Sequence, residues 1–384
     1  MIPEIDLLAG AFYGEGARET YAWMRAVAPA YFDEKNELWA LSTYDGVLAA
    51  ERDATTFSNA GGSRPDTGPL PWMIDMDGRD HAKRRKLVSR GFTPGRVRAS
   101  EAHVRALCDG LLDRALDARD CDLVRAIAAP LPMIVIGDML GIPATDRDQL
   151  LRWSDAMLGS LTGAPGALEA AADAFGAYDG YARALLAARR QDPRDDLVSV
   201  LVHARVDGEH LADDEIVMEA LLLLVGGDET TRHVISGGIE QLLAHPDALT
   251  MLRRRPEVSA SAVEEMLRWV SPIKNMNRTT TRRVDLFGVS VPAGSKVLLL
   301  YESANFDGAQ FADPDRFDVE RSPNDHVAFG FGAHFCLGAS LARLEVRSML
   351  ERMLARTSHI EALGPAVRSP IGTIESFPVR LAAR

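Results

Sequence analysis

Cysteine is scarce in this chain: its 384 residues include Cys108, Cys121 and Cys336 and no others. So small and odd a set does not form a disulfide framework, and no pair of them has the spacing of a zinc or iron–sulfur site. Cys108 falls on the apolar stripe of an expected helix, which predicts a core residue. Cys121, just beyond that helix, has no ligand spacing. Cys336 stands in a setting that suggests chemistry.

Other features are also missing. The chain does not open with a basic segment followed by an apolar one, and no apolar run approaches the roughly 20 residues that span a bilayer. We therefore expect a cytoplasmic protein without a transmembrane segment. Lysine and arginine number 43 against 55 acidic residues, a net charge of −12 that argues against general nucleic-acid binding. Internal repeats and linkers are absent. A chain of this length can bury a large cofactor without disulfide support.

Helical periodicity dominates what is present. Apolar residues between Val104 and Leu116 recur at i, i+3 and i+4, the pattern of an amphipathic helix. Asp213–His245 is predicted as one long helix that opens on acidic residues and ends before Pro246. Further helices are predicted over 146–162, 168–190, 259–269 and 339–356, short strands over 284–286, 289–291, 297–301 and 377–381, and a Gly- and Pro-rich loop over a site at 59–71. The expected fold class is mainly α with small β-sheets.

The most informative segment surrounds Cys336, where residues 329–338 read FGFGAHFCLG. Glycines let a backbone approach a flat cofactor closely. Backbone N–H groups, and the N-terminus of the helix that follows, would stabilise a thiolate. A thiolate with no other sulfur nearby suits the single axial ligand of a haem iron. Taken alone, a cysteine in a glycine-rich turn is more often a buried structural residue.

The segment from Phe329 to Gly338 resembles the signature of the cytochrome P-450 family, the haem-thiolate monooxygenases, and the resemblance extends over nearly the whole chain. Three more motifs match in order and spacing: Glu265-Met266-Leu267-Arg268 with Arg321, Gly226-Gly227-Asp228-Glu229-Thr230-Thr231, and His81-x-x-x-Arg85. The resemblance implies the cytochrome P-450 fold, a single helical domain over 1–384 with two small β-sheets. It also implies haem b (heme b, iron protoporphyrin IX) bound through the Cys336 thiolate.

The resemblance also assigns roles to residues. Thr230 would hydrogen-bond the oxygen molecule and its waters, and Glu229 would relay protons, so that these two and Cys336 are the catalytic set. The other haem-binding residues would be His81, Arg85, Arg278 and His334 at the propionates, with Gly226, Phe329, Gly330 and Gly338 beside the cofactor. Glu265, Arg268 and Arg321 would form a structural network that fixes the segment carrying the cysteine loop. A plainer interpretation of the long helix is a glycine pair for close packing, with Thr230 capping a bend.

Residues 79–98 hold eight basic residues and one acid, a cationic patch in an acidic protein. The chain has neither the length for a fused flavin domain nor the cysteines for a cluster, so electrons are expected from separate proteins. By resemblance the patch lies on the cysteine side of the haem. The expected partner is an acidic ferredoxin with its ferredoxin reductase, docking around Lys83, Arg84 and Lys86. A solvated basic helix is the alternative. Nucleic acid is not expected, because no aromatic residues interleave with the patch.

Residues 58–62, 72–77, 131–140 and 302–307 resemble the actinobacterial steroid C26/C27 side-chain monooxygenases. These hydroxylate the terminal methyl of cholesterol or cholest-4-en-3-one with O2 and oxidise it on to the acid. The resemblance implies a sterol substrate and a role in steroid catabolism. The apolar candidates for the substrate wall are Met73, Leu222, Val225, Ile273 and Phe377, each of which could be simple core. The alternatives are an ω-hydroxylase of methyl-branched fatty acids or other lipids, a peroxygenase, and a non-catalytic haem sensor or carrier.

Overall fold

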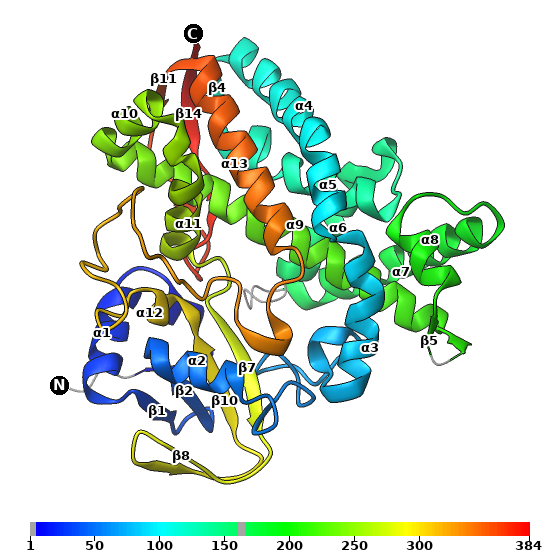
Figure 1. Ribbon diagram of the computed structural model, residues 1–384, viewed down its shortest axis with the longest axis vertical. Helices are drawn as coiled ribbons and strands as arrows, with labels where there is room; N and C mark the ends of the chain where they lie inside the picture. The colour runs from blue at the N-terminus through cyan, green and yellow to red at the C-terminus, as the bar shows by residue number, and fades with distance from the viewer. Residues whose placement is uncertain (1–4, 160–165, 207) are drawn as a thin grey trace.

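The computed structural model describes residues 5–159, 166–206 and 208–384 (Figure 1). Its helices are α1 (Ala17–Val27), α2 (Tyr44–Arg52), α3 (Gly78–Val88), α4 (Pro94–Ala118), α5 (Pro130–Leu140), α6 (Arg147–Gly159), α7 (Ala167–Gln191), α8 (Leu197–His203), α9 (Asp213–Ala244), α10 (Pro246–Arg254), α11 (Ser259–Val270), α12 (Tyr301–Asn305) and α13 (Ala339–Arg356). Among the described residues, no helix is long and apolar enough to cross a membrane.

The strands are shorter. They are β1 (Ala30–Asp33), β2 (Leu38–Leu41), β3 (Phe57–Ser58), β4 (Asp120–Asp122), β5 (Arg205–Val206), β6 (Glu209–His210), β7 (Asn275–Thr280), β8 (Val284–Leu286), β9 (Val289–Val291), β10 (Lys296–Leu300), β11 (Thr357–Ala362), β12 (Val367–Arg368), β13 (Ile374–Ser376) and β14 (Pro378–Ala383). Within the described residues they form a five-stranded sheet in the order β1-β2-β10-β7-β3, a three-stranded sheet in the order β11-β14-β4, and three two-stranded pairs. The mainly helical class with small sheets is confirmed.

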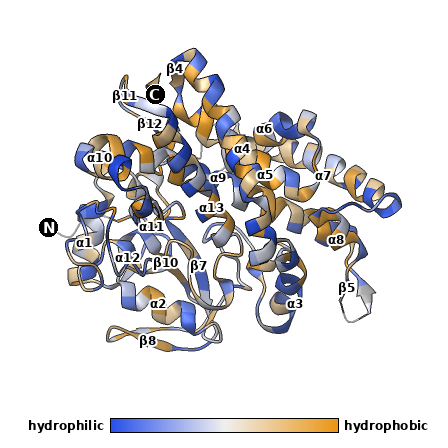
Figure 2. Ribbon diagram, turned by 45° about the horizontal axis from the view of Figure 1, so that its top comes forward, coloured by the Kyte–Doolittle hydropathy of each residue, from blue (hydrophilic) through white to orange (hydrophobic). Residues whose placement is uncertain are grey.

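Helix α9 runs through the middle of the molecule, with α13 beside it and the five-stranded sheet toward one end (Figure 1). Its N-terminus is capped by Glu215, whose carboxylate accepts the Ala212 N–H at 2.8 Å. The helix ends at Ala244 because Pro246 begins α10. The sequence predicted this helix to within one residue. It packs on α5, whose residues are almost all apolar, whereas α3 is largely hydrophilic (Figure 2).

The apolar stripe between Val104 and Leu116 lies on α4 and packs against α13 in the main core cluster, where Cys108 is fully buried as predicted. Other boundaries differ slightly from expectation. Tyr301 begins α12 instead of ending β10, and β14 begins at Pro378. Helix α6 begins at Arg147, and the expected helical end at 160–162 lies outside the described residues.

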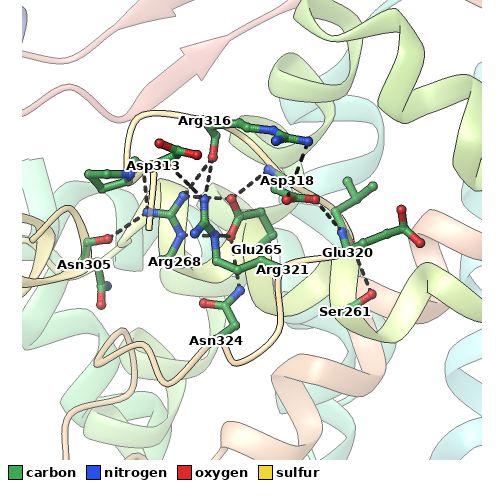
Figure 3. A network of polar contacts seen from close by, with 12 residues as sticks. Ser261, Glu265, Arg268, Asn305, Asp313, Arg316, Asp318, Glu320, Arg321 and Asn324 are labelled. Atoms are coloured by element: carbon green, nitrogen blue, oxygen red, sulfur yellow. Dashed lines mark hydrogen bonds and ion pairs between the residues drawn. The ribbon is translucent and has the colours of Figure 1, made fainter. Parts of the chain in front are cut away.

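A buried charge network fixes the long connection before the cysteine loop (Figure 3). Glu265 and Arg268 on α11 are fully buried, and the guanidinium donates to both carboxylate oxygens at 2.7 and 2.8 Å. Arg321 donates to the same carboxylate at 3.1 Å. The two arginines also donate to main-chain carbonyls of Asn305, Ala312, Asp313, Pro314 and Arg316. The network expected from the sequence is present, and it ties residues 305–324 to α11.

Candidate functional site

A cavity enclosing about 1330 Å³, open solvent at its mouth included, lies between α9, α3, β7 and the cysteine loop. Helix α9 contributes one of its faces to the wall: Leu222, Leu223, Gly226, Gly227, Thr230 and Thr231. The cysteine loop contributes Phe329, Gly330, His334, Cys336, Leu337 and Gly338. The chain thus brings the predicted oxygen-binding motif and the predicted haem ligand to one enclosed space.

The cysteine loop is held by its own backbone. The Cys336 N–H donates to the Phe329 carbonyl at 2.9 Å, and Gly330 and Gly332 adopt φ values of +64° and +71°. A Cβ at Gly332 would lie 2.6 Å from the main-chain oxygen of Glu51, so this glycine is required by space as well as by φ. The sequence therefore fixes a narrow turn that presents Cys336 to the cavity.

The surroundings of Cys336 fit a thiolate bound to a metal. Burial raises the pKa of its thiol, while backbone N–H groups of Gly338 and Ala339 and the charges of Arg85 and Arg343 act in the opposite direction. Metal coordination deprotonates a thiol outright, and these donors would then stabilise its charge. In the described part of the chain, no three His, Cys, Asp or Glu side chains gather into a metal site. Cys336 therefore offers one ligand, as a haem iron requires.

Four basic side chains expected at the haem propionates line this cavity together: His81 and Arg85 from α3, Arg278 from β7, and His334. The rings of His81 and His334 stack with centroids 4.1 Å apart. Burial, with the charges of His81 and Arg278, lowers the pKa of His334 to about 3. Because two guanidinium groups and two imidazole rings that can donate N–H hydrogen bonds converge in one enclosed space, the site suits a ligand with two carboxylates. The residues present therefore fit haem.

Sequence reasoning missed the partners of Arg278. Its guanidinium donates to Glu51 Oε1 at 3.1 Å, and the Tyr301 hydroxyl donates to the same oxygen. All three side chains are buried. Burial opposes the charge of Arg278, but Tyr301 and Glu51 outweigh it and raise the pKa of this guanidinium. Glu51 lies near the end of α2 without any motif around it, so no local signal could have found it.

The two glycines of the oxygen-binding motif differ in their surroundings. A Cβ at Gly226 would meet no atom within 4 Å, whereas one at Gly227 would approach Ile136 of α5 to 3.2 Å. Gly226 therefore leaves room at the cavity, and Gly227 allows close packing of two helices. The Thr230 hydroxyl donates to the Gly226 carbonyl at 2.9 Å. Both interpretations of this motif thus have a counterpart in the structure.

Glu229 points away from the cavity wall and into a chain of polar groups. Its carboxylate lies 3.3 Å from His233 Nε2 and 3.8 Å from Arg232, which binds the half-exposed Asp155 of α6 at 2.9 Å. Burial opposes ionisation of Glu229, but the hydrogen bond with His233 and the charges of His233 and Arg232 outweigh it and lower its pKa. Glu229 is therefore ionised near neutral pH and connected toward solvent. Sequence reasoning did not find His233, Arg232 or Asp155.

The predicted substrate wall is partly wrong. Met73, Leu222 and Ile273 line the cavity, but Val225 and Phe377 do not. On α9, Leu222 and Gly226 share the face that lines the cavity, and Val225 lies next to that face. Its side chain packs against a neighbouring apolar cluster. Phe377 is 3% exposed in the main core cluster, where the Leu123 N–H donates to its carbonyl at 2.8 Å.

The predicted docking face also needs a correction. Arg84 is buried, and its guanidinium pairs with Glu215 and Glu219 of α9, so its charge does not reach the surface. It points inward because it lies on the apolar side of α3 with Leu87 and Val88. Lys86 is exposed and Lys83 is half-buried. Phe331 and Phe335 of the cysteine loop are also exposed.

Comparison with known proteins agrees with this geometry. The family model described as cytochrome P450 matches residues 165–362. A steroid C26-monooxygenase of Mycobacterium tuberculosis (strain H37Rv) is 52% identical over 98% of this chain and 97% of that protein. One from Mycolicibacterium smegmatis is 52% identical over 92% of this chain and 89% of that protein.

Solved structures agree as well. The Mycobacterium marinum cytochrome P450 CYP268A2 in complex with pseudoionone has a TM-score of 0.92 at 32% identity and covers 99% of both chains. CYP109Q5 from Chondromyces apiculatus has a TM-score of 0.89 at 34% identity and covers 100% of both. The chain belongs to the cytochrome P450 family, whose members carry haem on a cysteine thiolate.

Proposed function

We propose that this protein is a steroid C26-monooxygenase, which hydroxylates the terminal side-chain methyl of cholesterol or cholest-4-en-3-one and oxidises it further to the acid. The observation that carries the proposal is the 52% identity to proteins named for this activity, over 98% of the chain. The whole chain would act as a single domain.

The shape and chemistry of the cavity support an apolar substrate. Its walls away from the cysteine loop are formed largely by aliphatic and thioether side chains: Met73, Ile74, Ile136, Leu222, Leu223, Ile273 and Met276. Transfer of a hydrocarbon chain from water to such walls is favourable in proportion to its area. A sterol side chain meets this requirement, and no charged group at these positions would have to lose its hydration.

Haem, when bound, supplies the redox chemistry that inserts one oxygen atom of O2 into a C–H bond. Cys336 would hold it as the axial ligand, and Arg85, Arg278, His81 and His334 would hold its two carboxylates. Phe329, Gly330 and Gly338 of the cysteine loop, with Gly226 of α9, would lie beside its flat faces. Each of these residues lines the cavity.

The proton supply would come from α9. We infer that Thr230 positions water and the oxygen molecule in the cavity, and that Glu229 passes protons to them. Support comes from the path that Asp155 and Arg232 form between solvent and Glu229. Because the pKa of Glu229 lies below its ordinary value, its carboxylate is ionised at neutral pH and would accept hydrogen bonds from water in this path.

Electrons would come from a ferredoxin reduced by its ferredoxin reductase. The docking face that we propose is the exposed side of α3, with Lys83 and Lys86, beside the exposed rings of Phe331 and Phe335. An acidic ferredoxin would be steered to this face by charge, and the short path to Cys336 through the cysteine loop favours electron transfer there.

Two measurements test the proposed function. Titration of the haem-loaded protein with cholest-4-en-3-one should move the Soret band to shorter wavelength as the water ligand is expelled. Incubation with ferredoxin, its reductase, NADPH and O2 should then yield the sterol hydroxylated at the terminal methyl, followed by the acid. A methyl-branched fatty acid serves as the comparison substrate. Turnover of the fatty acid without any turnover of the sterol would refute the assignment, and no turnover of either would favour a sensor or carrier.

A further inference from the structure

Glu219 is a buried carboxylate that neither haem binding nor the proton path uses. It lies on α9 one turn before Leu222 and Leu223, and it is 0% exposed. Its Oε1 accepts two hydrogen bonds, one from the Met73 N–H at 2.7 Å and one from Arg84 at 3.0 Å. Among the described residues, its Oε2 has no hydrogen-bond partner.

Such a carboxylate is costly to bury. Burial raises the pKa of Glu219 to about 7, although Arg84 and the Met73 N–H act in the opposite direction. A buried carboxylate with one oxygen left without a hydrogen-bond partner costs free energy, and a buried ion pair is weak evidence of stabilisation. The geometry explains what this carboxylate does: it joins a loop to two helices at one oxygen atom.

The loop that it holds forms one wall of the cavity. Met73 and Ile74 line the cavity together with Leu222 and Leu223 of α9. Within the loop, the Asp75 carboxylate accepts the N–H groups of Ser63 and Leu70 at 2.7 and 2.8 Å and the Trp72 indole N–H at 2.8 Å. Residues 63–75 therefore form a preassembled unit. The Met73–Glu219 hydrogen bond attaches this unit to α9.

Arg84 extends the connection to a third element. Arg84 lies on α3 next to Arg85 and one turn after His81. Its second guanidinium nitrogen pairs with Glu215, which lies one turn before Glu219 on α9. The arginine is buried, whereas the Glu215 side chain is 37% exposed, so solvent screens this pair in part. The loop wall, the helix that carries the propionate ligands and the central helix thus meet at one carboxylate.

We propose that Glu219 is a positioning residue that sets the separation between the Met73–Ile74 wall and the Leu222–Leu223 wall, and thereby determines how tightly the cavity holds a long apolar ligand. A small ligand that touches only the iron does not reach this wall and does not depend on it. The proposal does not rest on the identity of the natural substrate.

The test compares two ligands that differ in reach. Imidazole binds the haem iron directly, and 1-dodecylimidazole binds it in the same way but carries an apolar chain long enough to reach the walls. Both affinities are read from the red shift of the Soret band in haem-loaded protein. In Glu219→Leu, which keeps a side chain of similar size, the Met73 N–H and the Arg84 guanidinium both lose their acceptor. We expect about tenfold weaker binding of 1-dodecylimidazole and a change of less than about twofold for imidazole.

Glu215→Gln is the matched control. It removes a charge from Arg84 on the same helix and leaves the Met73–Glu219 hydrogen bond in place, so the ratio of the two affinities should stay at the wild-type value. An unchanged ratio in Glu219→Leu, or an equal change in both variants, would overturn the proposal. Failure of the protein to bind sterol would refute the proposed substrate without affecting this ratio.

A second, more conservative variant tests the proposal if the first variant does not fold. Glu219→Asp keeps the charge and shortens the side chain by one methylene, so its carboxylate cannot reach both partners. Hydrogen exchange measured on haem-loaded protein should accelerate in peptides that contain Met73 and Ile74, while peptides from 230–244 keep wild-type rates. Acceleration throughout the molecule would mean that Glu219 is merely structural, and wild-type rates in the loop would mean that it holds nothing there.

Discussion

At the scale of single residues, Cys336 is set apart from the other two cysteines by its surroundings. Its sulfur faces the cavity and has backbone N–H donors, whereas Cys108 is sealed in the core, where burial raises the pKa of its thiol to about 12. Cys336→His should therefore lose the red-shifted Soret band of the reduced carbon-monoxide complex, together with monooxygenase activity. Cys108→Ser and Cys121→Ser should keep both, and a thiolate-type spectrum in Cys336→His would refute the assignment.

Thr230 has either a chemical or a structural role, and one variant distinguishes the two. Its hydroxyl bonds to the Gly226 carbonyl, and it also lines the cavity. If it positions water and oxygen, Thr230→Ala should still bind substrate but release peroxide or superoxide, so that less product forms per electron. Product, peroxide and oxygen uptake measured together give the coupling. Full coupling in a well-folded variant would show that the hydroxyl only supports the helix.

Asp228 gives a pH-dependent prediction. Burial raises its pKa from 3.8 to about 7, because the charged form is poorly solvated there. The folded protein then binds more protons than the unfolded chain between about pH 4 and pH 7, so this residue lowers stability progressively as pH rises through that window and fully above it. Asp228→Asn should stabilise the protein above pH 7 by up to about 4 kcal/mol and leave stability near pH 4 unchanged.

Unfolding free energies measured at pH 4, 6 and 8 check this prediction. The matched control is Asp155→Asn, since Asp155 faces the same Arg232 but is half exposed. We expect a change below about 1 kcal/mol for it at every pH. A gain for Asp228→Asn that does not depend on pH would contradict the raised pKa.

Residues in motifs could be predicted from the sequence, and their partners could not. Cys336, His81, Arg85 and Thr230 lie in short patterns whose chemistry is local, and all four line the cavity. Glu51, Tyr301 and Glu219 act on residues distant in the chain, and their neighbours in sequence carry no trace of those contacts. Arg84 was misplaced for the same reason: its basic neighbours suggested a surface, whereas its partners lie on α9.

At the scale of elements, α11 holds the connection to the cysteine loop through Glu265 and Arg268. Removal of one member of a fully buried pair leaves an uncompensated charge, which costs about 3–5 kcal/mol. Arg268→Ala should therefore lower the thermal midpoint strongly and reduce haem content. Arg380→Ala breaks the solvent-exposed pair with Asp120 and should leave the thermal midpoint and the haem content nearly unchanged. Equal losses in the two variants, seen by calorimetry, would contradict a structural role for the network.

Helix α3 has two sides with different tasks, because Arg84 points inward and Lys86 is exposed. Lys86→Glu should slow reduction by ferredoxin about tenfold at low salt, with the difference fading as salt screens the charges. The control is Arg254→Glu on α10, which lies far from α3 in Figure 1 and should leave the rate unchanged. Rapid-mixing kinetics at several ionic strengths measure the rate of haem reduction. Equal rates for Lys86→Glu and wild type at low salt would show that ferredoxin docks on another face.

Helices were easier to predict than strands because their signal is local. The period of 3.6 residues defined α9 and α13 to within a residue, and Pro246 marked the end of α9. Strand β7 has a polar sequence, Asn275 to Thr280, and gave no alternating pattern. Its place is set by pairing with β10 and β3, which depends on segments distant in the chain.

At the scale of the whole molecule, the cavity is assembled from widely separated parts of the chain. Its walls come from the loop before α3, from α3, α9 and β7, and from the loop before α13. Because the assembly is long-range, the motif residues of the cavity could be listed from the sequence but its shape could not. For the same reason the sequence did not show that Val225 and Phe377 lie outside its walls. Packing of α9 at the centre brings the segments together.

The convergence of Arg85, Arg278, His81 and His334 has a consequence for how the protein matures in the cell. These groups come from α3, β7 and the cysteine loop, so an anion that binds all of them would link the three segments. Haem would supply that anion through its two carboxylates, and tight binding would stabilise the native state by mass action. Under iron starvation, newly made protein without haem should be less tightly packed around this cavity. It should then be degraded sooner than haem-loaded protein, so that haem supply would set the amount of enzyme.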